Sequence, residues 1–391
     1  MILNVLALGV LAFLIALPAT VVVRGVARRW SAFDSAGVEG QVKAPRRKVP
    51  NVGGIGIFVA IALPMVLFLS LARLHGHAEM LDPSDPSLVP VDVQEHLPGV
   101  LSRWREAVVL LGGAFLVHGL GLIDDRRPLG PFVKLAVMAI PALAVPMFGG
   151  TRLLTLMDAH VGGAWLSVGL TAVWIVVVMN AFNFMDNMDG LCGGVALVAS
   201  CSLLVTAVRF EQWFVAGTLA LVAGGTLGFL VFNFPWRPRG HDGQTRGASI
   251  FLGDGGSLLL GFVLAVLSVR LTYIRVGDAA PGWHAPLTPL VVLAVPLYDF
   301  ASVVLIRLVQ GKSPFVGDLQ HLSHRIERRG LSRRATVTVI VLFAAAFGLG
   351  GTVLATSTPR DAMVIGAQSA AILGALALFE WSETRQKRRG A

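Results

Sequence analysis

The stretch AWLSVGLTAVWIVVVMNAF, residues 164–182, has no charged side chain and is long enough to cross a bilayer. It runs directly into NFMDNMDG, residues 183–190, which places carboxylates and amides where the membrane helix meets water. Polar groups are costly at such a boundary unless they bind something. This junction therefore predicts a membrane-spanning helix that ends in a functional site.

Two further acidic segments occupy the same kind of position. Asp124 and Asp125 follow the apolar run 107–123. Asp254 lies in FLGDGGS, residues 251–257, just before another apolar run. Carboxylates gathered at one face of a membrane are suited to a divalent cation and a phosphorylated ligand.

The composition is that of a polytopic membrane protein. Of the 391 residues, 55% are hydrophobic and 14% are charged, and the mean hydropathy is +0.73. Soluble domains carry about 25% charged residues. The net charge of +9 is explained first by cytoplasmic loops rich in Lys and Arg, and we expect no nucleic-acid partner. Cys192 and Cys201 match neither a disulfide framework nor a zinc site, so we expect two buried thiols.

The chain is expected to form one all-α domain, residues 1–391, built from about eleven membrane-spanning helices. Each expected span has about 20 predominantly apolar residues. The first span is longer than a signal-peptide core and lacks a cationic start, so we expect it to be retained. The eleven ranges are roughly 2–23, 52–72, 106–123, 131–149, 164–182, 190–208, 213–233, 256–275, 287–309, 335–357 and 361–380.

An odd number of spans places the two termini on opposite sides of the membrane. With the N-terminus outside, the cytoplasmic loops and the basic tail at 381–391 hold 24 of the 32 Lys and Arg, which supports an N-out, C-in orientation. In that orientation Asp124, Asp254 and the NFMDNMDG segment all face the cytoplasm. Together with the segment 321–325, they are predicted to form a single cytoplasmic site.

The acidic segments each have a functional and an ordinary interpretation. Carboxylates at a helix C-terminus oppose the helix dipole, so the Asp124-Asp125 pair has no evident structural benefit there. The glycine-rich turn at 253–257 is either a plain helix N-cap or a phosphate-binding turn beside a metal ligand. Polar residues around 183 recur every three positions and would line one stripe of a helix. They are Asn180, Asn183, Asp186 and Asp189.

Two basic segments are less specific. Arg46, Arg47 and Lys48 would either anchor lipid headgroups or bind a phosphorylated ligand. His321 and His324 could hold a metal or hydrogen-bond a phosphate, but their spacing is a loose signal.

Together the motifs resemble the polyprenyl-phosphate N-acetylhexosamine-1-phosphate transferases, of the glycosyltransferase family 4 type. That family couples a cytosolic UDP-sugar to a membrane lipid phosphate. The resemblance runs from about Lys43 to Ser332, with the motifs in the same order. The matching elements are Pro50 to Gly56, Asp124-Asp125 with Lys134, Asn180 to Leu191, Asn233, Phe251 to Ser257, and Pro314 to Arg325.

Within the family, the stretch from Arg307 to Arg325 is similar to the branch that uses UDP-N-acetylglucosamine and starts O-antigen, teichoic acid or related polymers. The alternative is the phospho-N-acetylmuramoyl-pentapeptide transferase branch, which usually has a different, three-histidine loop. Asn187 departs from the family pattern, where Gly is common, and Ser323 departs where His is common. The segment 235–249 is longer and more polar than usual.

The resemblance implies a reaction in which undecaprenyl phosphate attacks UDP-N-acetylglucosamine and releases UMP. It implies Mg²⁺ or Mn²⁺ held by Asp254 and Asp189, and a catalytic pair, Asp124 and Asp125, that orients or deprotonates the lipid phosphate. It also implies a multi-pass protein in the bilayer of the bacterial cytoplasmic membrane, and it is compatible with a homodimer. The implied lipid-phosphate ligands are Arg46, Arg47 and Lys48, and the implied nucleotide or diphosphate ligands are Asn180, Asn183, Asp186, Asp189, Phe251, Lys134, His321, His324 and Arg325.

Two other classes are weighed against this interpretation. A membrane transporter would also have intramembrane acids, but transporters tend to show internal repeats and midplane charges, and neither is evident here. A CDP-alcohol phosphotransferase would gather its acids in one compact motif, whereas here they extend from Asp124 to Asp254.

Overall fold

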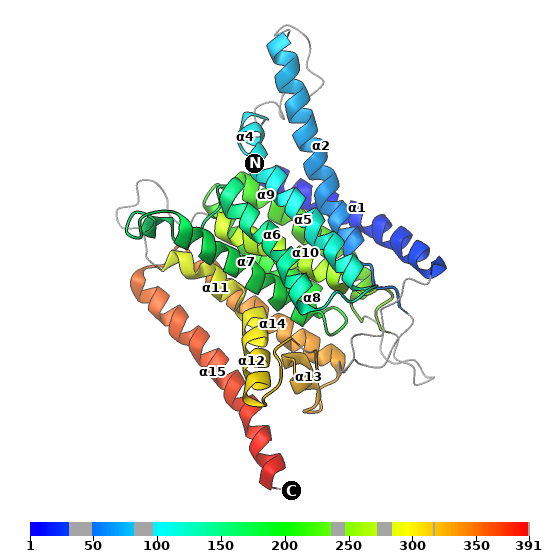
Figure 1. Ribbon diagram of the computed structural model, residues 1–391, viewed down its shortest axis with the longest axis vertical. Helices are drawn as coiled ribbons and strands as arrows, with labels where there is room; N and C mark the ends of the chain where they lie inside the picture. The colour runs from blue at the N-terminus through cyan, green and yellow to red at the C-terminus, as the bar shows by residue number, and fades with distance from the viewer. Residues whose placement is uncertain (31–48, 82–96, 236–246, 272–283, 316, 390–391) are drawn as a thin grey trace.

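The computed structural model describes residues 1–30, 49–81, 97–235, 247–271, 284–315 and 317–389. Within these ranges the protein is a bundle of helices without strands, apart from one isolated bridge between Asn51 and Phe251 (Figure 1). The expectation of an all-α membrane bundle is confirmed. Arg46, Arg47 and Lys48, the expected lipid-phosphate ligands, lie outside the described residues.

The helices follow one another along the chain with short connections in most places. They are α1 (Ile2–Arg29), α2 (Gly54–Leu81), α4 (Leu97–Ser102), α5 (Trp104–Asp124), α6 (Pro131–Phe148), η1 (Thr155–Met157), α7 (Trp165–Met185), α8 (Leu191–Arg209), α9 (Trp213–Asn233), α10 (Gly253–Arg270), η2 (Ala285–Leu287), α11 (Thr288–Val292), α12 (Ala294–Val309), α13 (Leu322–Glu327), α14 (Arg333–Leu354) and α15 (Pro359–Arg389).

Ten of the described helices are long and apolar enough to cross a membrane, and a bent pair brings the number to eleven. The pair is Ala285–Val292 with Ala294–Val309, and its two halves meet at 64°. Pro296 lies in the first turn of α12 and has no backbone N–H to continue the hydrogen-bonding of α11, which accounts for the break. Each of the eleven expected ranges thus has its helix, and the ninth is broken.

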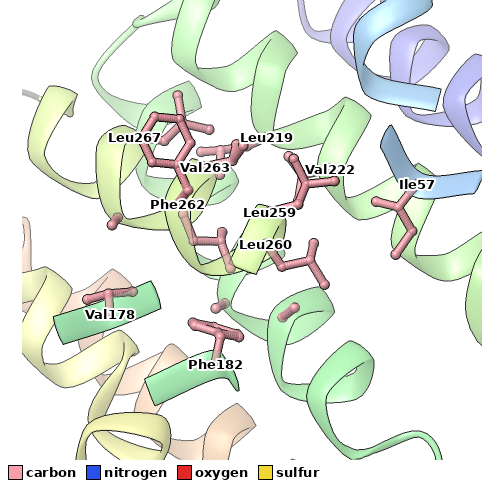
Figure 2. Packing of buried hydrophobic residues seen from close by; sticks show 14 of the residues in the cluster. Ile57, Val178, Phe182, Leu219, Val222, Leu259, Leu260, Phe262, Val263 and Leu267 are labelled. Carbon is pink, nitrogen blue, oxygen red and sulfur yellow. The ribbon is translucent and has the colours of Figure 1, made fainter. Parts of the chain in front are cut away.

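Helix α10 lies at the centre of the bundle, with 83% of its apolar stretch buried. Figure 2 shows Phe262 and its neighbours on α10 between residues of α9 on one side and α7 on the other. Lipid tails are as apolar as these side chains, so close packing, rather than water exclusion, holds helices together in a bilayer. Gly261 permits that packing, because a Cβ there would lie 2.7 Å from the Met179 Cα on α7.

Helices at the edge of the bundle are far less covered. Only 6% of the apolar stretch of α15 is buried, and Figure 1 shows this helix along the outside of the bundle, next to α14. The expectation of two buried thiols is half right, since Cys192 is buried but Cys201 is exposed on α8.

The packing of α5 against α10 determines which sequence motifs lie close together. The helices run in opposite directions, so Arg270 at the end of α10 forms an ion pair at 2.7 Å with Glu106 at the start of α5. At their other ends, the last turn of α5 lies against the first turn of α10. The contact is tight: a Cβ on Gly121 would lie 2.3 Å from the Gly255 nitrogen. Asp125 and Asp254 are thereby brought together from 129 positions apart.

Candidate active site

Asp125 holds three segments together at the C-terminal end of α5. Its carboxylate accepts hydrogen bonds from Asn51 Nδ2 at 2.9 Å and from the backbone N–H groups of Asp254 at 3.2 Å and Gly255 at 3.5 Å. Burial, and then the charge of Asp254, raise the pKa of Asp125 well above its usual range. Asp125 therefore organises the turn that presents Asp254 rather than facing solvent itself.

Lys134 connects the predicted acidic motifs. It lies in the first turn of α6, which begins at Pro131, a residue suited to that position because it lacks a backbone N–H. Its ammonium group contacts Asp124 Oδ2 at 3.1 Å, Asn183 Oδ1 at 3.3 Å and a carboxylate oxygen of Asp254. One cation is thus shared among side chains from α5, α7 and α10.

Asp254 is more accessible than the other two charged side chains of this group. Its side chain is 28% exposed, compared with 16% for Asp124 and 15% for Lys134. It also accepts a hydrogen bond from Asn183 Nδ2 at 2.9 Å. A carboxylate that is held by hydrogen bonds and still keeps part of its surface exposed is suited to an external cation or ligand.

The expected four-residue helical stripe is only partly present, because α7 ends at Met185. Asn183 reaches the Lys134 cluster, whereas Asn180 Nδ2 donates to the Val176 carbonyl of its own helix at 2.8 Å. Asp186 caps the helix, and Asp189 lies in the following turn, where it accepts a hydrogen bond from the Ala248 N–H at 3.0 Å. The loop is therefore a turn that leads into α8, and its polar groups do not share one face.

Residues 321–325, called the histidine segment below, contact the NFMDNMDG loop through aromatic rings. The His321 ring lies edge-on to Phe184, with centroids 5.3 Å apart. The guanidinium of Arg307 lies 5.2 Å from the Phe184 ring centre and is 2% exposed. Arg307 also donates to Asp318 Oδ1 at 3.0 Å. Burial alone would raise the pKa of Asp318, but the hydrogen bond and the charge of Arg307 lower it, so this carboxylate is ionised at neutral pH.

Two members of the expected phosphate-binding set face other partners. Arg325 forms a two-bond ion pair with Glu380 of α15, at 2.8 and 3.2 Å. His324 Nδ1 lies 3.6 Å from a Glu327 carboxylate oxygen. Burial and the neighbouring His321 lower the pKa of His324. Their assignment to the diphosphate stays a prediction, and Arg325 would first have to leave Glu380.

Phe251 belongs to the glycine-rich turn, and its backbone is fixed against the strand-like segment before α2. Its N–H donates to the Pro50 carbonyl at 2.8 Å, and its carbonyl accepts from the Gly53 N–H at 2.8 Å. Stacking of its ring on a nucleobase stays a prediction.

The sequence interpretation missed three residues that hold the site together: Asn51, Asp299 and Glu380. Asn51 binds Asp125, Asp299 binds the histidine segment, and Glu380 binds Arg325. Asp299 had a signal, since it is an ionisable residue inside the ninth apolar stretch. Asn51 lies in the matching element Pro50 to Gly56, but its partner could not be read from the sequence. Glu380 had no signal.

The residues that form the Lys134 cluster lie within a region that matches a known protein family. Residues 107–272, which include the two Asp motifs and Lys134, match the model of glycosyl transferase family 4. The decaprenyl-phosphate N-acetylglucosaminephosphotransferase of Mycobacterium leprae is 31% identical over 281 residues, which cover 66% of this chain and 67% of that protein. The chain belongs to glycosyl transferase family 4. The expected family, and with it the expectation of a transferase, is therefore confirmed.

Other members of glycosyl transferase family 4 show similar coverage. The probable undecaprenyl-phosphate N-acetylglucosaminyl 1-phosphate transferase of Bacillus subtilis is 28% identical over 264 residues, covering 66% of this chain and 69% of that protein. The undecaprenyl-phosphate alpha-N-acetylglucosaminyl 1-phosphate transferase of Escherichia coli K12 is 30% identical over 253 residues, covering 61% and 63%.

Proposed function

We propose that the protein transfers N-acetylglucosamine 1-phosphate from UDP-N-acetylglucosamine to undecaprenyl phosphate or a similar polyprenyl phosphate. The observation that most supports this is the cluster of Lys134 with Asp124, Asn183 and Asp254 at one end of the bundle. The names of the relatives support the acceptor and the transferred sugar. We place the reaction on the cytoplasmic face of the bacterial inner membrane, in the N-out, C-in orientation.

A magnesium ion fits this donor set. Among the described residues, no three His, Cys, Asp or Glu side chains are arranged to hold a metal on their own. Mg²⁺ commonly needs fewer, because it keeps several waters and binds one or two carboxylates together with substrate phosphates. Asp254 and Asp124 already flank a cationic group, the Lys134 ammonium. We therefore propose Asp254 as the main protein ligand; a bound metal would take the place of the Lys134 ammonium beside it and would offset phosphate charge.

The reaction brings together three phosphates, and their mutual repulsion is the main obstacle. A bound Mg²⁺ would offset that charge. In the proposed step, an oxygen of the lipid phosphate forms a bond to the sugar-side phosphorus of the donor. The bond from that phosphorus to the bridging oxygen breaks, and UMP leaves. The second pKa of a phosphate is about 6, so the attacking oxygen is already largely deprotonated at neutral pH.

The protein groups then have distinct tasks. Lys134 would hold a phosphate oxygen once it is released from Asp254. Asp124 is bound through both oxygens, by Lys134 and by the Leu129 N–H at 2.8 Å, so we assign it to orientation of Lys134. The engaged oxygens of Asp124 and Asp125 favour direct attack by the lipid over a covalent aspartyl-phosphate intermediate.

The donor is best tested directly with the purified protein. UMP release is measured with Mg²⁺, undecaprenyl phosphate and a panel of UDP-sugar donors that includes UDP-N-acetylglucosamine and UDP-N-acetylmuramoyl-pentapeptide. The mass of the lipid product is determined by mass spectrometry. We expect turnover of the first donor and none of the second. Preference for the pentapeptide donor would shift the protein to the other branch of the family. Absence of UMP release from every UDP-sugar would overturn the proposed activity and leave transport as the rival function.

A further inference from the structure

Asp299 is a fully buried carboxylate on α12, with 0% of its surface exposed. Both of its oxygens are used by the segment that contains the histidines. Oδ2 lies 3.1 Å from His321 Nδ1, and Oδ1 accepts a hydrogen bond of 2.6 Å from the Leu322 N–H. One side chain of a membrane helix therefore holds both the ring and the backbone at the start of α13.

The contact with a carboxylate determines how the His321 ring is protonated. An ionised carboxylate only accepts hydrogen bonds, so an ionised Asp299 requires that Nδ1 bear a proton. In the neutral ring, Nε2 is then left as an acceptor. Without Asp299 no hydrogen bond at Nδ1 would select one of the two tautomers.

The orientation of His321 bears on the candidate active site because the ring packs on Phe184. Phe184 directly follows Asn183, whose amide binds both Asp254 and Lys134. The His321 side chain is 10% exposed and the Asp299 side chain 1%, so the ring keeps some exposed surface while Asp299 is enclosed. Without the ring contact, one oxygen of the buried Asp299 carboxylate would lose its hydrogen bond, which is costly in an apolar medium.

We propose that Asp299 is a positioning residue that fixes His321 as the Nδ1–H tautomer, with Nε2 presented as a hydrogen-bond acceptor to the bound donor substrate. An acceptor at this position suits the hydroxyl or acetamido N–H groups of a sugar rather than the anionic oxygens of its diphosphate. This inference rests on the proposed function for the identity of the donor, but the tautomer can be measured without any substrate.

The first test is made on the unmodified protein. The chain is labelled with ¹⁵N at its nine histidines and solubilised, and the His321 signals are identified by their loss in His321→Gln. At about pH 8, where an ordinary histidine is neutral, we expect the Nδ1–H tautomer. Finding the Nε2–H tautomer at His321 would overturn the proposal, whatever the protein's activity proves to be.

The second test uses Asp299→Asn, which preserves the size of the side chain and an oxygen that can accept from Leu322. Its NH₂ group now donates, so His321 Nδ1 must become the acceptor and the tautomer must switch. We expect kcat/KM for UDP-N-acetylglucosamine to fall by about tenfold or more, comparable to the loss when the hydrogen-bond partner of a metal-ligating histidine is removed. An unchanged tautomer or an unchanged kcat/KM would contradict the proposal.

A double-mutant cycle separates positioning from a purely structural role. If Asp299 acts through the ring, Asp299→Asn should cause little further loss in a His321→Ala background. A loss of the same size in both backgrounds would show that Asp299 only supports the fold. If the wild-type protein turns over no UDP-sugar, the proposed function fails, whereas the tautomer measurement still decides the assignment of Asp299.

Discussion

The hydroxyl of Ser323 donates a hydrogen bond to the Asn187 side-chain oxygen, across 136 positions of sequence. At both positions the resemblance to the family indicates a departure from the usual residue. Ser323 is buried on α13, and Asn187 lies in the turn after α7, where its NH₂ group donates to the Phe184 carbonyl at 2.6 Å. The two departures therefore constitute one local change, a hydrogen bond that joins the histidine segment to the NFMDNMDG loop.

This pair should behave as a coupled unit. Ser323→Ala and Asn187→Ala should each lower the free energy of unfolding by about 1 kcal/mol, the usual contribution of a hydrogen bond. The double variant should lose less than the sum, since residues in contact are not additive. Thermal unfolding of the four solubilised proteins gives the coupling. Strict additivity would show that the contact contributes no stability.

Asp254→Asn should abolish UMP release while the protein remains folded. The amide keeps the shape and can still bind Asn183, but it lacks the charge that a hard cation such as Mg²⁺ requires. The same assay should lose activity with a chelator and regain it with Mg²⁺ or Mn²⁺. Asp158→Asn, a matched change in the Arg152–Asp158 ion pair away from the site, should keep its activity. Near-normal turnover by folded Asp254→Asn would remove Asp254 from the mechanism.

The ion pair between Arg325 and Glu380 should stabilise the attachment of α15. The side chains are 9% and 12% exposed, and Glu380 also accepts a hydrogen bond of 2.7 Å from the Tyr298 hydroxyl. Glu380→Gln leaves the buried guanidinium without its counter-charge, so we expect a loss of about 3 kcal/mol in the free energy of unfolding. Asp361→Asn, at the exposed first turn of the same helix, should cost less than about 1 kcal/mol. Equal effects of the two variants would contradict this interpretation.

His324 should make the protein less stable in mild acid. Burial and His321 lower its pKa in the folded state, so the unfolded chain binds a proton that the folded protein resists. Stability is then fully present above the ordinary histidine pKa of about 6.5 and is lost as the pH falls toward the lower folded value. The melting temperature measured across this range should fall less steeply in His324→Gln. An unchanged slope in that variant would assign the acid sensitivity to other groups.

The orientation in the membrane can be checked with single cysteines in a Cys192→Ala, Cys201→Ser background. Arg127→Cys, beside the acidic pair, should react with an impermeant thiol reagent only after the membrane is opened. Ala159→Cys, in the segment between α6 and α7, should react from the periplasmic side of intact cells. Both positions are exposed in the structure. The reverse pattern of labelling would invert the N-out, C-in assignment.

The sequence alone was enough to define the elements of the fold and the family. Charge-free stretches of bilayer length predict spanning helices, because a buried backbone in lipid must satisfy its own hydrogen bonds, and the structure has a helix in each expected range. The order of the motifs indicated the family, and the number of spans placed Asp124, Asp254 and the NFMDNMDG segment on one face of the membrane. The structure brings Asp124, Asn183 and Asp254 together around Lys134, a contact that the sequence did not predict. The three-residue spacing of polar side chains was a less reliable guide at the NFMDNMDG segment. It predicted one helical stripe, but α7 ends at Met185, before the stripe is complete.

Only the tertiary structure decided which partner each polar side chain has. Hydrogen bonds and ion pairs form between atoms within about 3 Å, and a hydropathy pattern contains no information on that scale. The sequence therefore could not show that Asp125 binds the turn of Asp254, that Asp299 holds His321, or that Arg325 pairs with Glu380. A membrane helix is recognised from its own residues alone, but the partner of a side chain depends on how helices distant in sequence pack together.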